Sequence, residues 1–226
     1  IKKLYLKDSG DDKVLFSLLK KAEARHILVE RMPLDKMTVQ FKKGVHQGVV
    51  AITDALPEFN ESDLSSLLSN SKNPPLILIL DGITDPHNLG ACLRCADGAG
   101  ADFVIIPKDK NVGITPVVSK VASGALEAVP LVRVTNLART IKTLQKEGVW
   151  IYGAAGDAQK DIYAMDFKHA AALVLGAEGK GMRRLTREHC DEVFALPMRG
   201  SVSSLNVSVA AGIALYEAVR QRIEMP

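Results

Sequence analysis

Six short runs rich in apolar residues, spread between residues 76 and 196, limit what this chain can fold into more than any other feature. The first run, LILIL at 76–80, has no polar residue and is typical of a strand buried on both faces of a parallel sheet. Helix-like periodicity separates several runs, notably at 88–98 and 137–146. This alternation predicts an α/β domain with a mostly parallel sheet. The other five runs lie at 103–106, 131–134, 149–152, 172–175 and 193–196.

Residues 1–53 have a different pattern and predict a small α+β domain. A strand is expected at 3–6, a helix at 14–25, and two further strands at 26–29 and 49–52, joined by a loop. This part contains eleven Lys or Arg against six Asp or Glu, a formal charge of +5, whereas the rest of the chain carries −2. A basic domain beside a near-neutral one favours binding of a polyanion, although solvated surface lysines are the plain alternative.

Residues 54–73, between these two parts, are rich in Ser, Asn and acidic residues, with a short helix expected at 63–68. We interpret them as a linker or covering segment that ends at Pro74-Pro75, so that the second domain spans 74–226. The chain begins at Ile1 rather than Met. We therefore expect that the true start of the first domain precedes it.

Composition restricts the class of protein. The chain is 47% hydrophobic and 24% charged, as ordinary globular proteins are. Its apolar runs are all far shorter than the roughly 20 residues of a membrane helix, and it shows no secretory signal pattern. The three cysteines form no disulfide framework, which favours a reducing, cytoplasmic location.

Unusual residues follow three of the predicted strands, at the sheet edge where α/β proteins bind ligands. They include DGITDPHNLGACLR at 81–94, in which Asp85 or Asn88 can cap the following helix. LGAEGKGMRR at 175–184 has neither the spacing of a phosphate-binding P-loop nor that of a dinucleotide-binding turn. A Gly- and Ser-rich loop then leads into a helix expected at 205–222. Asn206 is unexpected within that helix, because Asn is a poor helix former.

Three motifs within these stretches carry a family resemblance. NLGACLR at 88–94 (first motif), LGAEGKG at 175–181 (second motif) and PMRGSVSSLNVSVA at 197–210 (third motif) resemble those of the SpoU-type branch of the SPOUT RNA methyltransferases. Their residues and spacing are most similar to those of the bacterial 23S rRNA guanosine-2′-O-methyltransferases of that branch. Residues 1–53 look, more loosely, like the substrate-binding domain of the family.

The resemblance implies both an activity and a fold. Members transfer a methyl group from S-adenosylmethionine to a ribose 2′-oxygen of RNA and need no metal. They look like homodimers with a deep trefoil knot near the C-terminus, and the last helix lies at the interface. From pattern alone we would expect an unknotted sheet, because true knots are nearly absent from proteins.

The resemblance also assigns five catalytic candidates. Arg94 matches the residue often described as the base, but a guanidinium is effectively always protonated. We therefore expect Arg94 to hold a phosphate and to stabilise a developing alkoxide, with Asn88 and Glu178 orienting it. Ser204 and Asn206 are expected to hydrogen-bond the ribose or its phosphate.

Donor-binding positions of the family match Gly176, Leu196 and Leu205. Their backbone groups are expected to meet the adenine and ribose of the donor, while the apolar side chains flank the base. Gly156, in the turn after the 149–152 strand, is a further candidate for the same pocket.

Other readings of single residues remain open. Cys92 and Cys95 spell C-x-x-C, but a zinc site needs more ligands, and packing within a helix is the better account. His87 beside Asn88 is an alternative base. His46 in GVHQG at 44–48 either touches substrate or belongs to a turn.

The sequence thus predicts methylation of a ribose 2′-hydroxyl in large-subunit ribosomal RNA. The alternatives are the same chemistry on tRNA, and a non-catalytic RNA-binding or ribosome-assembly factor that keeps the fold.

Overall fold

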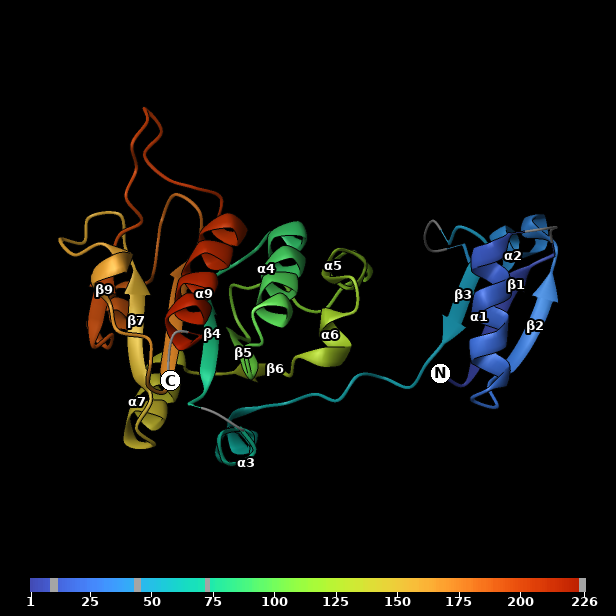
Figure 1. Cartoon of the computed structure of the whole chain (residues 1–226), viewed down its shortest axis with the longest axis horizontal. Helices are drawn as coiled ribbons and strands as arrows, with labels where there is room; N and C mark the ends of the chain where they lie inside the picture. Colours follow the sequence, from blue (N-terminus) through green and yellow to red (C-terminus); the bar gives the residue numbers. More distant parts are fainter. Residues whose placement is uncertain (9–11, 43–45, 72–73, 224–226) are drawn as a thin grey trace. The chain divides into compact units, whose positions relative to one another are not determined.

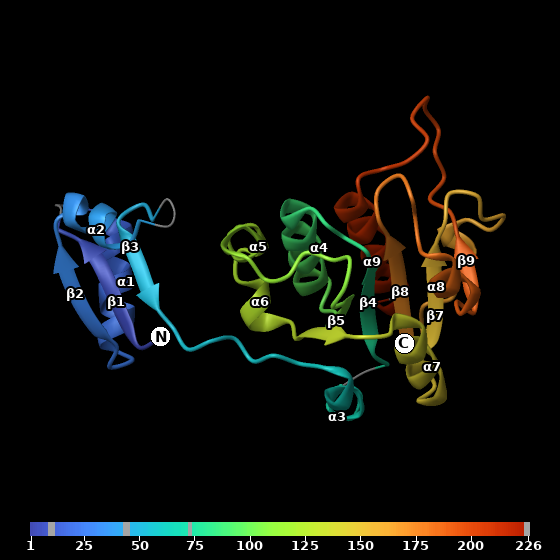
Figure 2. The ribbon, with the colours of Figure 1, turned by 180° about the vertical axis from the view of Figure 1, so that it is seen from behind.

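The computed structural model describes residues 1–8, 12–42, 46–71 and 74–223, which form two compact units. The units are Ile1–Leu56 and Pro57–Pro226, and each can be followed by colour in Figures 1 and 2.

A three-stranded sheet forms the centre of the first unit. Strand β1 (Lys3–Lys7) lies between β2 (Leu28–Met32), to which it is parallel, and β3 (Val49–Ile52), to which it is antiparallel. Successive side chains of a strand point to opposite faces. Helices α1 (Lys13–Glu23) and α2 (Leu34–Gln40) therefore cover β1 from the two sides. Leu4 and Leu6 pack with Ala22 of α1, and Tyr5 packs with Met37 of α2.

Two predictions for the first unit are wrong in detail. A loop was expected where α2 forms, because this helix has only seven residues and buries only Met37, too little for a periodic pattern. The strand predicted at 26–29 begins at Leu28 instead, since His26 takes a left-handed φ of 53° after helix α1. Of the GVHQG segment, Gly44 and Val45 lie outside the described residues, and the ring of His46 accepts the N–H of Gly48 at 3.1 Å.

A six-stranded parallel sheet, in the order β6-β5-β4-β8-β7-β9, forms the second unit. The prediction of an α/β domain with a mostly parallel sheet is confirmed. The strands are β4 (Leu76–Asp81), β5 (Phe103–Pro107), β6 (Leu131–Val134), β7 (Trp150–Ala154), β8 (Ala171–Gly176) and β9 (Glu192–Phe194).

Helices cover both faces of this sheet. Ile77 and Ile79 of β4 pack in one apolar cluster with α3 (Leu64–Ser69) and α7 (Leu137–Lys146). On the other face, α4 (Pro86–Gly98) and α9 (Val207–Ile223) pack against each other and against the central strands, as Figures 1 and 2 show. Shorter helices complete the unit: α5 (Pro116–Ala122), α6 (Ala125–Ala128), α8 (Arg184–Glu188), η1 (Glu61–Asp63) and η2 (Ile162–Ala164).

The last helix begins two residues later than predicted, and this shift explains Asn206. Its side-chain oxygen accepts the N–H of Ser208 at 2.9 Å, and its carbonyl accepts the N–H of Ala210. Asn206 therefore caps α9 instead of lying within it, and capping is what Asn does well. Helices α5, α6 and α8 were not predicted, because each is too short to show a 3.6-residue period.

Residues 57–71 belong to the second unit and pack against its sheet. The backbone of Phe59 bridges to Val132 of edge strand β6, and Leu64 is buried in the cluster beneath the sheet. Within the described residues, none of the helices has both the length and the apolar character needed to cross a membrane.

Candidate active site

A cavity of about 780 Å³ opens at the carboxyl ends of β7 and β8, beside the start of α9. The second motif lines it, together with the turn after β7 and the chain from β9 into the third motif. The segment between β9 and α9 extends beyond the strand ends, as Figures 1 and 2 show. The cavity therefore lies where parallel sheets bind ligands.

Asn206 joins the three motifs. Its side-chain amide donates to Asn88 Oδ1 at 2.9 Å and to Glu178 Oε1 at 2.6 Å. Its side-chain oxygen accepts both the backbone N–H and the hydroxyl of Ser208. An amide nitrogen has two hydrogens, and both are engaged here. One residue from each motif thus meets at a single hydrogen-bonded cluster.

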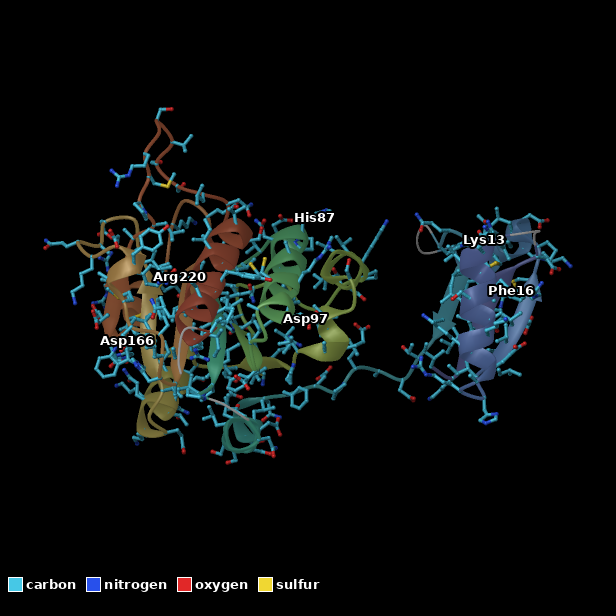
Figure 3. The ribbon with its side chains drawn as sticks, viewed as in Figure 1. Lys13, Phe16, His87, Asp97, Asp166 and Arg220 are labelled. Atoms are coloured by element: carbon cyan, nitrogen blue, oxygen red, sulfur yellow. The ribbon has the colours of Figure 1, made fainter. Side chains whose placement is uncertain are left out.

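The start of α4 holds Asn88 in place. The carboxylate of Asp85 caps this helix by accepting the N–H groups of His87 at 3.1 Å and Asn88 at 3.3 Å. Asn88 is buried, whereas His87 is exposed at the same helix end, where Figure 3 labels it. Of the two predicted caps, Asp85 is the one that the helix uses, and Asn88 is left to bond Asn206.

Arg94 lies outside the cavity wall. It is exposed on α4, and among the described residues its guanidinium has no hydrogen-bond or ion-pair partner. The thiol of the neighbouring Cys95 donates to the carbonyl of Ser208 at 3.7 Å, so α4 meets the first turn of α9 at the residue next to Arg94. Asn88 and Glu178, which were expected to orient Arg94, both bond to Asn206 in this structure, and their action on Arg94 stays a prediction.

The remaining predicted residues lie on the cavity wall. Ser204, Leu205 and Leu196 border it with the third motif and the end of β9, and Gly176 and Gly156 border it from the other side. A Cβ at Gly176 would overlap the backbone of Gly181 and Met182, so the second motif folds directly over this glycine. At Gly156 a Cβ would meet no described atom within 4 Å.

Two charged residues on the wall, both outside the three motifs, were missed. Arg187 donates to both carboxylate oxygens of Asp157, at 2.8 and 2.9 Å. This hydrogen bonding from Arg187 lowers the pKa of Asp157. Asp157 follows Gly156 directly and could have been noticed beside it, but nothing in the local sequence marks Arg187.

Cys92 and Cys190 pack within the fold, and their thiols are not activated as nucleophiles. Cys92 is buried in α4, and burial raises its pKa to about 12. Burial likewise raises the pKa of Cys190 to about 12. Across the described ranges, no three His, Cys, Asp or Glu side chains are grouped so that they could hold a metal ion.

Comparison with known families separates the chain into two matched regions. Residues 75–216 match the SpoU rRNA methylase family. Residues 1–59 match the family described as RNA 2′-O ribose methyltransferase substrate binding.

Close relatives and solved structures resemble the whole chain. It is 54% identical over 225 residues to 23S rRNA (guanosine-2′-O-)-methyltransferase RlmB of Pseudomonas putida, covering 98% of this chain and 89% of the relative. The RlmB of Ralstonia nicotianae is also 54% identical, with 100% of this chain and 90% of the relative covered. The crystal structure of the SpoU methyltransferase AviRb from Streptomyces viridochromogenes, in complex with the cofactor AdoMet, superposes with a TM-score of 0.80 at 26% identity. That match covers 100% of this chain and 84% of AviRb. With its three motifs joined through Asn206 and a family match over residues 75–216, the chain belongs to the SpoU rRNA methylase family.

Proposed function

We propose that this protein transfers a methyl group from S-adenosylmethionine to the ribose 2′-hydroxyl of a guanosine in 23S ribosomal RNA. The main support for the proposal is the pair of hydrogen bonds from Asn206 to Asn88 and Glu178, which joins the first motif to the two motifs that line the cavity. Relatives named for this reaction are 54% identical over nearly the whole chain.

The cavity suits the methyl donor. Its volume of about 780 Å³ lies within the range of small-ligand pockets, about 300–1,000 Å³. The side chains of Leu196 and Leu205 offer apolar surface to a base, and the open space at Gly156 leaves room beside the backbone. These residues and Gly176 would hold the donor, and the carboxylate of Glu178 on the wall complements a positive charge. When bound, S-adenosylmethionine supplies a methyl group on a positively charged sulfur.

The polar residues of the site have two different roles, positioning other side chains and binding the ribose. Asn206 has both amide hydrogens engaged, so it holds Glu178 and Asn88 in place rather than binding the ribose itself. Ser204 is exposed at the cavity and its hydroxyl is suited to bond the ribose or its phosphate. Holding the ribose oxygen in line with the methyl group supplies several kcal/mol of the barrier reduction, on the order of 7–11 at best.

Arg94 receives the incoming RNA. Its exposed guanidinium on α4 is free to take a phosphate next to the target ribose and to stabilise the alkoxide that develops as the proton leaves. It does not take that proton, because a guanidinium stays protonated at any physiological pH. Proton loss therefore goes to water or to another acceptor.

A homodimer accounts for the exposed apolar stripe of α9. Val209, Ile213 and Tyr216 follow one face of the helix and are 49%, 37% and 53% exposed. A second copy packed on this stripe would bury it, and the stripe lies on the helix that packs against Arg94-bearing α4.

We also propose the trefoil knot of the family. Strand β9 is at the edge of the sheet, beside β7, yet α9 packs against β4 and β8 near its middle. The chain after Val193 must cross the ends of the intervening strands, and we infer that it threads through an earlier loop there.

The first unit would hold the ribosomal RNA, consistent with its eleven basic and six acidic residues within 1–53. A cytoplasmic location agrees with this substrate and with three cysteines that are free thiols.

The test is methyl transfer from labelled S-adenosylmethionine to 23S rRNA and to tRNA transcripts, with the modified ribose located by mass spectrometry. Arg94→Ala should abolish transfer while the donor dissociation constant, measured by calorimetry, stays within about tenfold. Arg139→Ala, an exposed arginine on α7, is the matched control and should keep full activity.

The outcomes separate the alternatives. Methylation of tRNA alone would replace the proposed substrate, and donor binding without any transfer would favour an assembly factor. Loss of donor binding together with transfer in Arg94→Ala would contradict the role given to Arg94.

A further inference from the structure

Asp81, the last residue of β4, has a buried carboxylate that binds both the backbone N–H and the guanidinium of Arg183. Its side chain is 0% exposed, whereas that of Arg183 is 42% exposed. Oδ2 of Asp81 accepts the backbone N–H of Arg183 at 2.9 Å. Oδ1 accepts Nε at 2.5 Å and lies 2.5 Å from Nη2. The carboxylate therefore fixes both the backbone and the guanidinium of one residue.

The ion pair of Asp81 and Arg183 joins the two ends of the loop formed by the second motif. In the pairing of β4 with β8, Asp81 lies opposite Gly176, where the motif leaves the sheet, and Arg183 follows where the motif ends. Between them the N–H of Gly181 donates to the carbonyl of Ala177 at 2.8 Å, folding the loop back over Gly176. Glu178 projects from this closed turn to Asn206 at 2.6 Å.

Asp81 is also connected to the first motif. Four residues after it, Asp85 caps α4 and so sets the position of Asn88. The two groups that bond the amide of Asn206 are thus both anchored close to Asp81, one through β4 and α4 and the other through Arg183.

We propose that Asp81 and Arg183 are positioning residues for methyl transfer, acting through Glu178. The inference rests on the proposed function and adds two residues outside the three motifs. An ion pair that must desolvate a buried carboxylate such as Asp81 contributes little net stability compared with apolar side chains of similar size, so we infer that the pair serves to fix geometry. One carboxylate that accepts the backbone N–H on one oxygen and two guanidinium nitrogens on the other constrains direction as well as distance, which is what a turn carrying Glu178 needs.

A double-mutant cycle tests this proposal. Asp81→Asn keeps the shape of the side chain but removes its charge, and it is measured in the wild-type and Glu178→Gln backgrounds. We expect it to lower kcat and to weaken S-adenosylmethionine binding by about tenfold in the wild type, since small displacements of positioning groups are costly. In the Glu178→Gln background both losses should fall below about twofold, because the group being positioned is gone.

Thermal unfolding provides the structural readout for the same cycle. If Asp81 only stabilised the fold, its effects on Tm, donor affinity and kcat would be the same in both backgrounds, and that result would overturn the proposal. Donor affinity is measured by calorimetry, so the cycle does not depend on residual transfer by Glu178→Gln. If Asp81→Asn does not fold, Arg183→Lys replaces it, since it keeps the charge and loses the fork.

Glu188→Gln is the matched control. It breaks the exposed pair between Arg184 and Glu188 on α8, at 2.8 Å, and should leave kcat and donor affinity unchanged. A wild-type protein that binds donor but methylates no RNA would refute the proposed function. The cycle on donor affinity would still decide whether Asp81 acts through Glu178.

Discussion

The side-chain amide of Asn206 donates a 2.9 Å hydrogen bond to the side-chain oxygen of Asn88, although 118 residues separate the two along the chain. Asn88 is in the first turn of α4, and Asn206 caps α9, so the bond joins the starts of two helices. The same amide holds the carboxylate of Glu178, which also lies 3.5 Å from the N–H of Val207. A negative charge at a helix start is favourable, because the helix dipole is positive there.

Replacing Asn206 should separate its capping role from its role in the site. Asn206→Ala loses the cap and both amide bonds, and it should lower the free energy of unfolding by about 1–2 kcal/mol while abolishing transfer. Asn206→Ser retains a capping oxygen but has no amide, so it should recover most of the stability and little of the activity. Urea unfolding and methyl-transfer assays measure the two effects. Full activity in Asn206→Ser would show that its bonds to Glu178 and Asn88 are dispensable.

Gly156→Ala tests where the donor lies. A Cβ there meets no described atom within 4 Å, so the substitution should leave thermal stability unchanged. It places a methyl group on the cavity wall, and we expect S-adenosylmethionine to bind at least about tenfold more weakly by calorimetry.

Gly200→Ala is the matched control for Gly156→Ala. Gly200 has equally open surroundings but does not border the cavity, so donor affinity should be unchanged. Equal donor affinity in both variants would mean that the donor does not approach Gly156.

Ile213→Glu tests the dimer interface. A charge in the middle of the exposed stripe of α9 would have to be desolvated when a second copy packs there, so the variant should be monomeric. Light scattering coupled to gel filtration measures the mass. Val39→Glu, an exposed apolar site in the first unit, should leave the mass unchanged. A dimeric Ile213→Glu would place the interface elsewhere.

The thiols of buried Cys92 and half-buried Cys190 should resist alkylation, and their raised pKa gives a direction to the pH dependence of stability. Cys92 and Cys190 have pKa values of about 12, against roughly 8.5 for an exposed thiol. At pH 8 iodoacetamide should therefore label them slowly in the folded protein and rapidly in urea, as mass spectrometry would show. Rapid labelling of Cys92 in the folded protein would mean that the α4 core opens.

Because the folded state holds these thiol protons more tightly, the thiols favour folding fully below the unfolded pKa. That contribution is lost as the pH rises from roughly 8.5 towards about 12. Alkaline unfolding should therefore begin at a higher pH in Cys190→Ala than in the wild type, provided that both are compared with their own stability at pH 7.

Much of the second unit can be read directly from the sequence. The run LILIL is completely apolar and becomes β4, one of the two central strands, with each residue buried. The pattern at 137–146 becomes α7 with the same bounds, because its apolar side is regular over almost three turns. The cap at Asp85 is a local signal as well, since its carboxylate needs only backbone N–H groups two and three residues away.

The sequence by itself determined the kinds of elements, the three motifs and the residue types at the site, since periodicity, caps and short motifs are local properties. Only the tertiary structure decided that Asn206 bonds Asn88 and Glu178. It also decided that Arg94 lies outside the cavity wall and that Asp81 binds Arg183. These contacts depend on the order of strands in the sheet and on where distant loops meet. Local patterns carry no information on either, because the packing of the whole core selects them.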